Sequence, residues 1–351
     1  MRALLKPVLV LGLAATLTAC PPSDSMRSAS GESPSASAGK RGSGAVSAAD
    51  PRAQAAGEEI LAKGGSATDA AIAVMLALSV VEPQSSGIGG GGFLVHAGEG
   101  GVTTYDGRET APASATPTRF LDEDGKRLPR DKRVLSGLSV GVPGNLALAA
   151  KVHSQHGKLE WAQLFEPAIR LAGNGFVMNR RLHGSLSGSK GRADKTDEAR
   201  SIFFGGDGEP LPVGTRITNP TFARTLESLA SAGPRYMYFV MAPRLAAYLA
   251  EETPQDGRMV EADIDAYTAK LRDPVCGRYR TYKICGMGPP SSGGVAVAQI
   301  LGQLERFDLA AMGPESPTFW HLFLESQRVA YADRGLYMGD ADFVPVPVEG
   351  L

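Results

Sequence analysis

The amino-acid sequence predicts a mixed fold of the α/β (α+β) class, because patterns typical of helices and of strands follow one another along the chain. A helix is expected to begin near Ala67 and to end at Pro83, since proline cannot continue a helix. Two strands, 93–96 and 102–105, are expected on either side of a glycine-rich turn at 98–101. This alternation is typical of domains in which helices pack on sheets.

The first of these helices is expected to lie inside the protein. Ser66 and Asp69 have the spacing of a capping box, in which two side chains satisfy backbone N–H groups at a helix start. Every residue from 70 to 78 is apolar, so no side of the helix is suited to water. The stretch is shorter than the roughly 20 residues that cross a bilayer. Residues 67–81 are therefore predicted to be among the most buried of the chain.

Gly173 and Gly175 would end a helix that covers 167–172. A longer helix is expected over 318–334. Three of its aromatic side chains are predicted to lie in the core: Phe319, Trp320 and Phe323.

The serine- and glycine-rich run 85–92 lies between the first helix and the first strand. Its glycines allow the backbone to lie close to another segment or to a ligand, and these two interpretations stay open. A phosphate-binding loop needs a strand before it and a helix after it. Here the order is reversed, so nucleotide binding is not expected.

Arg108 is the candidate binding residue. It stands where the second strand ends, and a guanidinium there can hold a carboxylate through two parallel hydrogen bonds, which a lysine cannot do. The alternative is a structural ion pair with Asp106 or Glu109.

Three motifs, at 64–71, 81–93 and 106–112, carry a resemblance to a known family. With them the sequence resembles the gamma-glutamyltransferase family, also called glutathione hydrolases, from about residue 50 to residue 348. The resemblance implies an N-terminal nucleophile hydrolase fold, a four-layer αββα sandwich of which this chain forms part. It also implies a strand over 134–142, followed by helices over 146–150 and 167–172. It also implies that Arg108 holds the α-carboxylate of a γ-glutamyl substrate.

The same resemblance implies the chemistry. A threonine, freed by self-cleavage of a precursor, uses its own amine as the base for its hydroxyl, and the resulting γ-glutamyl ester passes to water or to an amino acid. That threonine is expected downstream of Leu351, so no catalytic residue and no cofactor are expected within the chain.

Two functional classes therefore compete. In the first, the chain is the N-terminal part of a glutathione hydrolase, which cleaves γ-glutamyl amide bonds together with a small-subunit polypeptide. In the second, it is a catalytically inactive, lipid-anchored fragment or a binding protein for γ-glutamyl compounds. A threonine-led continuation encoded past Leu351 would favour the first.

The start of the chain indicates the cell envelope. Residues 1–20 have a basic start, an apolar core and a cysteine at the end, which is typical of a bacterial lipoprotein signal with lipidation at Cys20; a simple secretory peptide is the alternative. Residues 21–49 are mostly small and polar and are expected to be a flexible tether. The globular region is expected to span 50–351, with Asp50 and Pro51 beginning its first helix.

Cys276 and Cys285 flank a predicted hairpin centred on residues 280 and 281. In that register the two cysteines face each other at a non-hydrogen-bonded pair, so an oxidising compartment would permit a disulfide. Two separate buried thiols are the alternative.

Metal and nucleic acid are not expected as ligands. His153 and His156 lie three apart on a predicted helix, but no third ligand clusters with them. The net charge is −1, from 36 basic and 37 acidic residues, and no basic run marks a nucleic-acid surface.

Overall fold

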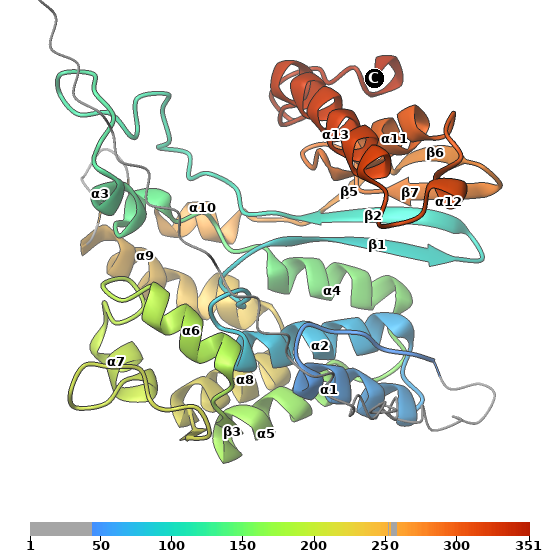
Figure 1. Cartoon of the computed structure of the whole chain (residues 1–351). Coiled ribbons are helices and arrows are strands. Elements are labelled where there is room, and N and C mark those ends of the chain that lie inside the picture. The colour runs from blue at the N-terminus through green and yellow to red at the C-terminus, as the bar shows by residue number, and fades with distance from the viewer. Residues whose placement is uncertain (1–43, 252, 254–257) are drawn as a thin grey trace, which may run out of the picture. The chain divides into compact units, whose positions relative to one another are not determined.

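A computed structural model describes residues 44–251, 253 and 258–351 (Figure 1). The predicted lipoprotein signal, Cys20 and most of the predicted tether lie outside the described residues. The description below concerns the globular region.

Two packed helices open this region. Helix α1 (Pro51–Ala62) is capped by Asp50, whose carboxylate accepts the backbone N–H of Arg52. Helix α2 (Ala67–Val81) begins with the predicted capping box, in which the Ser66 hydroxyl accepts the N–H of Asp69 and the Asp69 carboxylate accepts the N–H of Ser66. Helix α2 ends before Pro83, and most of its residues are buried, so both predictions for it are confirmed.

A three-stranded antiparallel sheet lies over α4 (Asn145–His156), as Figure 1 shows. Strands β1 (Gly92–Gly98) and β2 (Gly101–Gly107) form the predicted hairpin. Strand β5 (Lys270–Arg272) joins the free edge of β2. Tyr105 of β2 is fully buried against α4, so the two layers share a small apolar core.

The predicted strand over 134–142 is wrong. The structure has a short helix α3 (Arg130–Val134) and a 3-10 turn η1 (Gly137–Ser139), and Val142 makes only a single bridge, to Thr110. A Cβ on Gly137 would lie 1.8 Å from Thr253 Oγ1. Gly137 thus packs tightly against a residue more than a hundred positions away, and no larger side chain fits in this turn.

The main core is formed by α1, α2 and α4 together with the elements that follow α4 in the sequence, up to α10. The 3-10 turn η2 (Trp161–Phe165) runs into α5 (Glu166–Asn174), which ends at Gly175 with φ 86°, as predicted. The remaining elements of this part are β3 (Phe176–Val177), α6 (Arg180–Gly188), α7 (Asp197–Phe203), β4 (Arg216–Ile217), α8 (Pro220–Ala232), the π-helix η3 (Tyr236–Met241), α9 (Ala242–Glu251) and α10 (Glu261–Asp265).

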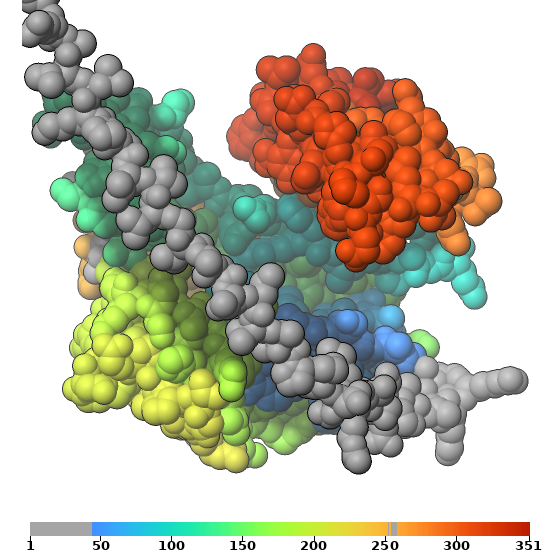
Figure 2. Space-filling model, in the orientation of Figure 1, coloured from blue at the N-terminus to red at the C-terminus, as the bar shows by residue number. Residues whose placement is uncertain are grey.

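The C-terminal part gathers into one mass, orange to red in Figure 2. It contains the hairpin β6 (Val275–Tyr279) and β7 (Tyr282–Gly286), then α11 (Gly293–Leu304), α12 (Leu309–Met312), α13 (Pro317–Tyr337) and the 3-10 turn η5 (Val348–Gly350). Helix α13 packs mainly on α11.

The prediction that three aromatic side chains of α13 lie in the core is wrong. Trp320 is 49% exposed, and Phe319 and Phe323, whose rings stack at 6.2 Å, are only half-buried. Helix α13 packs mainly on α11, so its other faces are less covered by the described residues.

Candidate functional site

Three segments that are separate in sequence meet around the end of β2. They are the glycine-rich loop that follows α2, residues 106–110 at the strand end, and the turn at 141–145. The carbonyl of Gly90 accepts the backbone N–H groups of Gly144 and Asn145, at 2.9 and 3.0 Å, and the Asn145 amide donates to the carbonyl of Gly87 at 2.7 Å. These bonds fasten the loop to the start of α4 and close it over the strand end.

Glycine is required where these segments touch. A Cβ on Gly91 would lie 2.5 Å from the carbonyl oxygen of Gly107, and a Cβ on Gly144 would lie 2.0 Å from the same oxygen. Both distances are below any real contact. For Gly91, therefore, close backbone packing is the reason for the glycine. Gly89 has open space around it, so a ligand contact remains available there.

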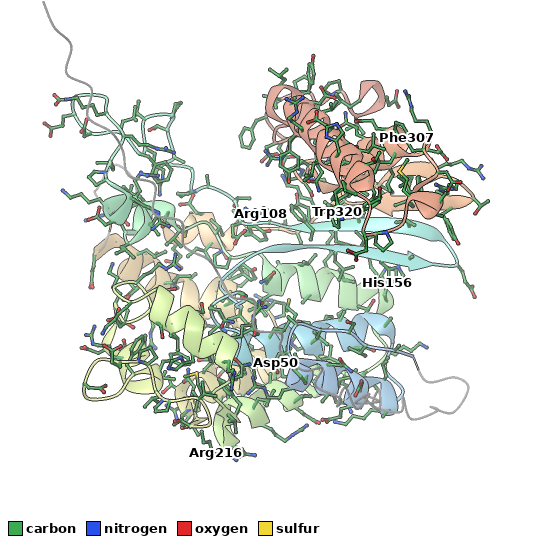
Figure 3. All side chains as sticks on the ribbon, viewed as in Figure 1. Asp50, Arg108, His156, Arg216, Phe307 and Trp320 are labelled. Atoms are coloured by element: carbon green, nitrogen blue, oxygen red, sulfur yellow. A yellow bond between two sulfur atoms is a disulfide. The ribbon has the colours of Figure 1, made fainter. Side chains whose placement is uncertain are left out.

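Arg108 follows directly after β2 (Figure 3), and two hydrogen bonds hold its backbone, one at its N–H and one at its carbonyl. Its N–H donates to Asp106 Oδ1 at 2.9 Å, and its carbonyl accepts the Tyr267 hydroxyl at 2.7 Å. Burial, and then the neighbouring Tyr238, raise the pKa of Tyr267 well above its ordinary value. The Tyr267 hydroxyl is therefore a permanent donor at neutral pH.

Tyr267 is in turn supported by Tyr238. The two rings stack with centroids 6.0 Å apart and planes 7° from parallel, and the Tyr238 hydroxyl donates to the carbonyl of Pro143 at 2.8 Å. Burial raises the pKa of Tyr238 to about 12. The two tyrosines thus brace the strand end against the start of α4.

The Arg108 guanidinium is open to solvent. Its side chain is 63% exposed, and its one ion pair among the described residues joins Nε to Glu109 Oε2 at 3.4 Å, beyond good hydrogen-bonding geometry. Asp106, the other partner considered from sequence, is instead paired with Arg272 at 2.9 Å. Arg108 therefore has a fixed backbone and a guanidinium that can take a two-point carboxylate ligand.

Sequence reasoning missed the residues that hold Arg108. Tyr267 and Arg272 stand more than 150 residues away, and no motif links them to the strand end. Asp342, which binds Arg272, lies in none of the three motifs that carry the resemblance.

The remaining predicted site residues lie elsewhere. Cys276 and Cys285 face each other in the predicted hairpin register, with Cα atoms 4.1 Å apart, and form a disulfide. His153 contacts the carbonyl of Leu159, and His156 stacks on His96. Within the described ranges no group of three or more potential metal ligands occurs.

The fold and site define the large-subunit portion of an N-terminal nucleophile hydrolase. The sequence pattern that describes gamma-glutamyltranspeptidase matches residues 53–351, and the chain belongs to the gamma-glutamyltranspeptidase family. The crystal structure of Helicobacter pylori gamma-glutamyltranspeptidase superposes with a TM-score of 0.82 at 36% identity, covering 88% of this chain and 87% of that one. The predicted family and fold class are thereby confirmed.

Two curated relatives are similar in sequence. The glutathione hydrolase proenzyme of Bacillus subtilis (strain 168) is 39% identical over 312 residues, which are 88% of this chain and 52% of the relative. That of Escherichia coli (strain K12) is 38% identical over 311 residues, 88% of this chain and 53% of the relative. The chain thus spans about half the length of the curated relatives it matches.

Proposed function

We propose that this chain supplies the carboxylate-binding part of a glutathione hydrolase, an enzyme that cleaves γ-glutamyl amide bonds and transfers the γ-glutamyl group to water or to an amino acid. Family membership supports the reaction class. The observation that carries the proposal is Arg108, whose backbone is held by Asp106 and Tyr267 while its guanidinium stays exposed.

In this proposal Arg108 fixes the substrate, and a threonine on a further segment attacks it. The guanidinium holds the α-carboxylate at two points, which fixes the distance from that group to the γ-amide carbon. The threonine hydroxyl, activated by its own amine, forms a γ-glutamyl ester that water or an amino acid then opens. No cofactor is needed for this chemistry.

The test combines the chain with a downstream polypeptide from its own coding region or from a relative. Alone, the chain is expected to release no product from a γ-glutamyl anilide, and the combination is expected to be active. In the active combination Arg108→Lys should lower kcat/KM by about thirtyfold or more, since a point charge replaces a charge-assisted two-point contact worth about 2 kcal/mol.

An analogue without the α-carboxylate serves as the internal control. It should be a poor substrate of the unmodified enzyme and should be barely affected by Arg108→Lys. Arg224→Lys, on an exposed position of α8, is the matched control variant and should leave both substrates unchanged. Equal losses for both substrates with Arg108→Lys would reject the carboxylate-binding role.

A binding protein for γ-glutamyl compounds is the second candidate function. The contacts that hold Arg108 all come from this chain, which favours binding without the rest of the enzyme. If calorimetry detects γ-glutamyl ligand binding to the chain, if Arg108→Lys abolishes it, and if no downstream polypeptide restores cleavage, this second function replaces the first.

Anchoring to the cell envelope through a lipid on Cys20 is proposed on the sequence of residues 1–20 alone. Among the described residues, no helix is long and apolar enough to cross a membrane. Metabolic labelling with a radioactive fatty acid should mark the wild-type protein and leave Cys20→Ser unlabelled; equal labelling of the two would reject the anchor.

A further inference from the structure

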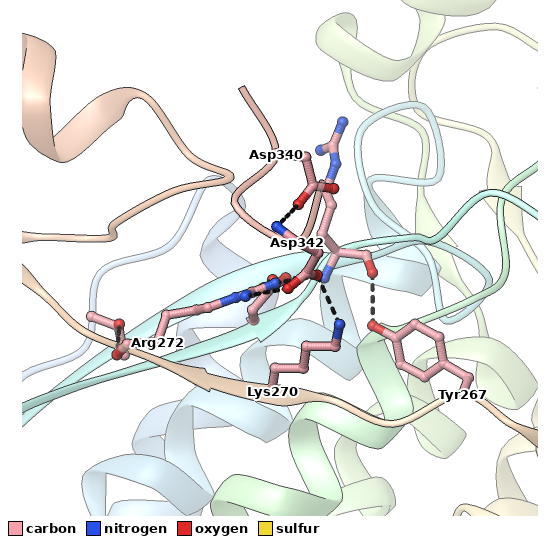
Figure 4. A network of polar contacts seen from close by, with 8 residues as sticks. Tyr267, Lys270, Arg272, Asp340 and Asp342 are labelled. Carbon is pink, nitrogen blue, oxygen red and sulfur yellow. Dashed lines mark hydrogen bonds and ion pairs between the residues drawn. The ribbon is translucent and has the colours of Figure 1, made fainter. Parts of the chain in front are cut away.

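A continuous set of polar contacts joins Arg108 to the segment that follows α13 (Figure 4). Asp342 accepts two parallel hydrogen bonds from Arg272, Nη1 to Oδ1 and Nη2 to Oδ2, both at 2.7 Å, and a third from Lys270 Nζ at 2.7 Å. On its other side, Arg272 donates from Nε to Asp106 Oδ2 at 3.0 Å. Arg272 therefore bridges two carboxylates that stand far apart in sequence.

The two carboxylate oxygens of Asp106 have different partners. Oδ2 accepts from Arg272, and Oδ1 accepts the backbone N–H of Arg108 at 2.9 Å. Because a carboxylate is flat and rigid, a rotation that changes one of these bonds also changes the other. The orientation of Asp106 thus couples Arg272 to the backbone of Arg108.

The Asp106–Arg272 pair is the buried part of this set, and Asp342, whose side chain is 31% exposed, is its more open end. The side chains of Asp106 and Arg272 are 7% and 15% exposed. Hydrogen bonds from Arg272 and Lys270 hold the pKa of Asp342 well below its ordinary range, so Asp342 stays charged at any working pH. A charged group in a poorly solvated site that loses one of two partners shifts toward the partner that remains.

The local backbone presents Asp342 to Arg272. Asp340 Oδ1 accepts the N–H of Asp342 at 3.0 Å, and the Asp340 carbonyl accepts the N–H groups of Phe343 and Val344. In the sequence Gly339-Asp340-Ala341-Asp342-Phe343, Asp340 therefore forms the turn and Asp342 binds Arg272.

We propose that Asp342 is a positioning residue for Arg108: by fixing Arg272 and, through it, Asp106, the seated segment 338–351 sets the orientation of the carboxylate-binding arginine. The effect of this link on substrate binding rests on the proposed function. The contacts from Asp342 to Arg108 do not depend on it. The competing explanation is that the Arg272–Asp342 pair only fastens the segment to β5.

The amide of Arg108 distinguishes the two explanations in the chain alone. In Asp342→Asn, the hydrogen exchange of this amide should become about tenfold faster. The reason is that Arg272 loses a charged partner and then holds Asp106, the acceptor of the amide, less firmly. Glu349→Gln, the same kind of change at an exposed position of the same segment, should leave it unchanged. Asp342→Glu, which keeps the charge, should restore most of the protection.

Arg272→Lys is the second variant, because lysine keeps the charge but lacks the planar guanidinium that donates two parallel hydrogen bonds to Asp342 and a third to Asp106. It should also accelerate exchange at Arg108, while amides of α2 keep wild-type rates and so report an intact fold. The proposal is overturned if either variant loosens 338–351 and leaves the Arg108 amide unchanged. If exchange at Arg108 responds but Arg108→Lys does not discriminate between substrates, the positioning link stands and the proposed function fails.

Discussion

Helices α2 and α13 are packed very differently: α2 is apolar along most of its length, whereas α13 mixes apolar residues with polar and charged ones. Ten of the fifteen residues of α2 are buried, whereas only Ser326 and Ala330 are buried among the twenty-one residues of α13. Helix α2 is packed by α1, α4, α5 and η2, while α13 rests on α11 and touches α12. Apolar side chains therefore indicate that a surface needs a neighbour, but the number of neighbours in the described chain decides whether it is buried.

The strongest way to test this contrast is to empty a core position of α2. Leu76 is fully buried, so Leu76→Ala should lower the free energy of unfolding by about 3 kcal/mol, through lost apolar burial and the cavity left behind. Urea denaturation followed by circular dichroism measures this change. A loss below about 1 kcal/mol would mean that α2 is less tightly packed than its burial indicates.

A second test concerns how each helix start is fixed. Asp69 Oδ2 accepts the N–H groups of Ser66, Lys158 and Leu159 at 2.8, 2.9 and 3.2 Å, so Asp69→Ala leaves buried donors unpaired and should cost about 2 kcal/mol.

The N-cap serine of α13, Ser316, is the control for Asp69. The Ser316 hydroxyl accepts one N–H, that of Phe319, at 3.4 Å, so Ser316→Ala should cost about 0.5 kcal/mol. Equal losses at Asp69 and Ser316 in the same denaturation experiment would remove the distinction between the two helix starts.

A third test matches Leu76 with a leucine of α13. Leu324 is 57% exposed, so Leu324→Ala should change the free energy of unfolding of this chain by no more than about 0.5 kcal/mol. A loss of 2 kcal/mol or more would show that this face of α13 is covered in solution, for example by a second copy of the chain.

The smallest expected effect is a pH dependence of stability that arises from a histidine of the β1–β2 sheet. His96 of β1 stacks on His156 of α4 at 3.8 Å, and burial, with the charge of His156, lowers the pKa of His96 below 6.5. The unfolded chain then takes up the proton more readily than the folded chain. Stability contributed by His96 is therefore present above pH 6.5 and is lost as pH falls through the lowered pKa.

Replacing His96 checks that sign. In His96→Gln the decrease in melting temperature between pH 7.5 and pH 5 should be smaller than in the wild-type chain, and His321→Gln, at an exposed position of α13, serves as the control. An unchanged or steeper pH dependence in His96→Gln would contradict the assignment.

Features fixed by neighbouring residues were predictable from the sequence. The capping box of α2, the glycine end of α5 and the register that places Cys276 opposite Cys285 depend on contacts within about ten residues. Such contacts have the same geometry wherever the chain folds, so residue type and spacing are sufficient to predict them.

Features that depend on distant contacts were not predictable. The family resemblance implies a strand over 134–142, but Gly137 lies against Thr253 and the segment forms a short helix and a 3-10 turn. Trp320 was expected in the core, yet it is 49% exposed. In the first case a remote residue lies against the segment, and in the second no remote segment among the described residues buries the side chain.

The candidate site divides along the same line. The sequence by itself determined the family, the glycine-rich loop and the choice of Arg108, because these are carried by residue types in short motifs. Only the tertiary structure decided that Asp106 binds Arg272 and the backbone of Arg108, that Tyr267 holds its carbonyl, and that Asp342 completes the set. A side chain's polar partners are chosen by which atoms the fold brings within about 3 Å, and that proximity is set by the packing of whole elements.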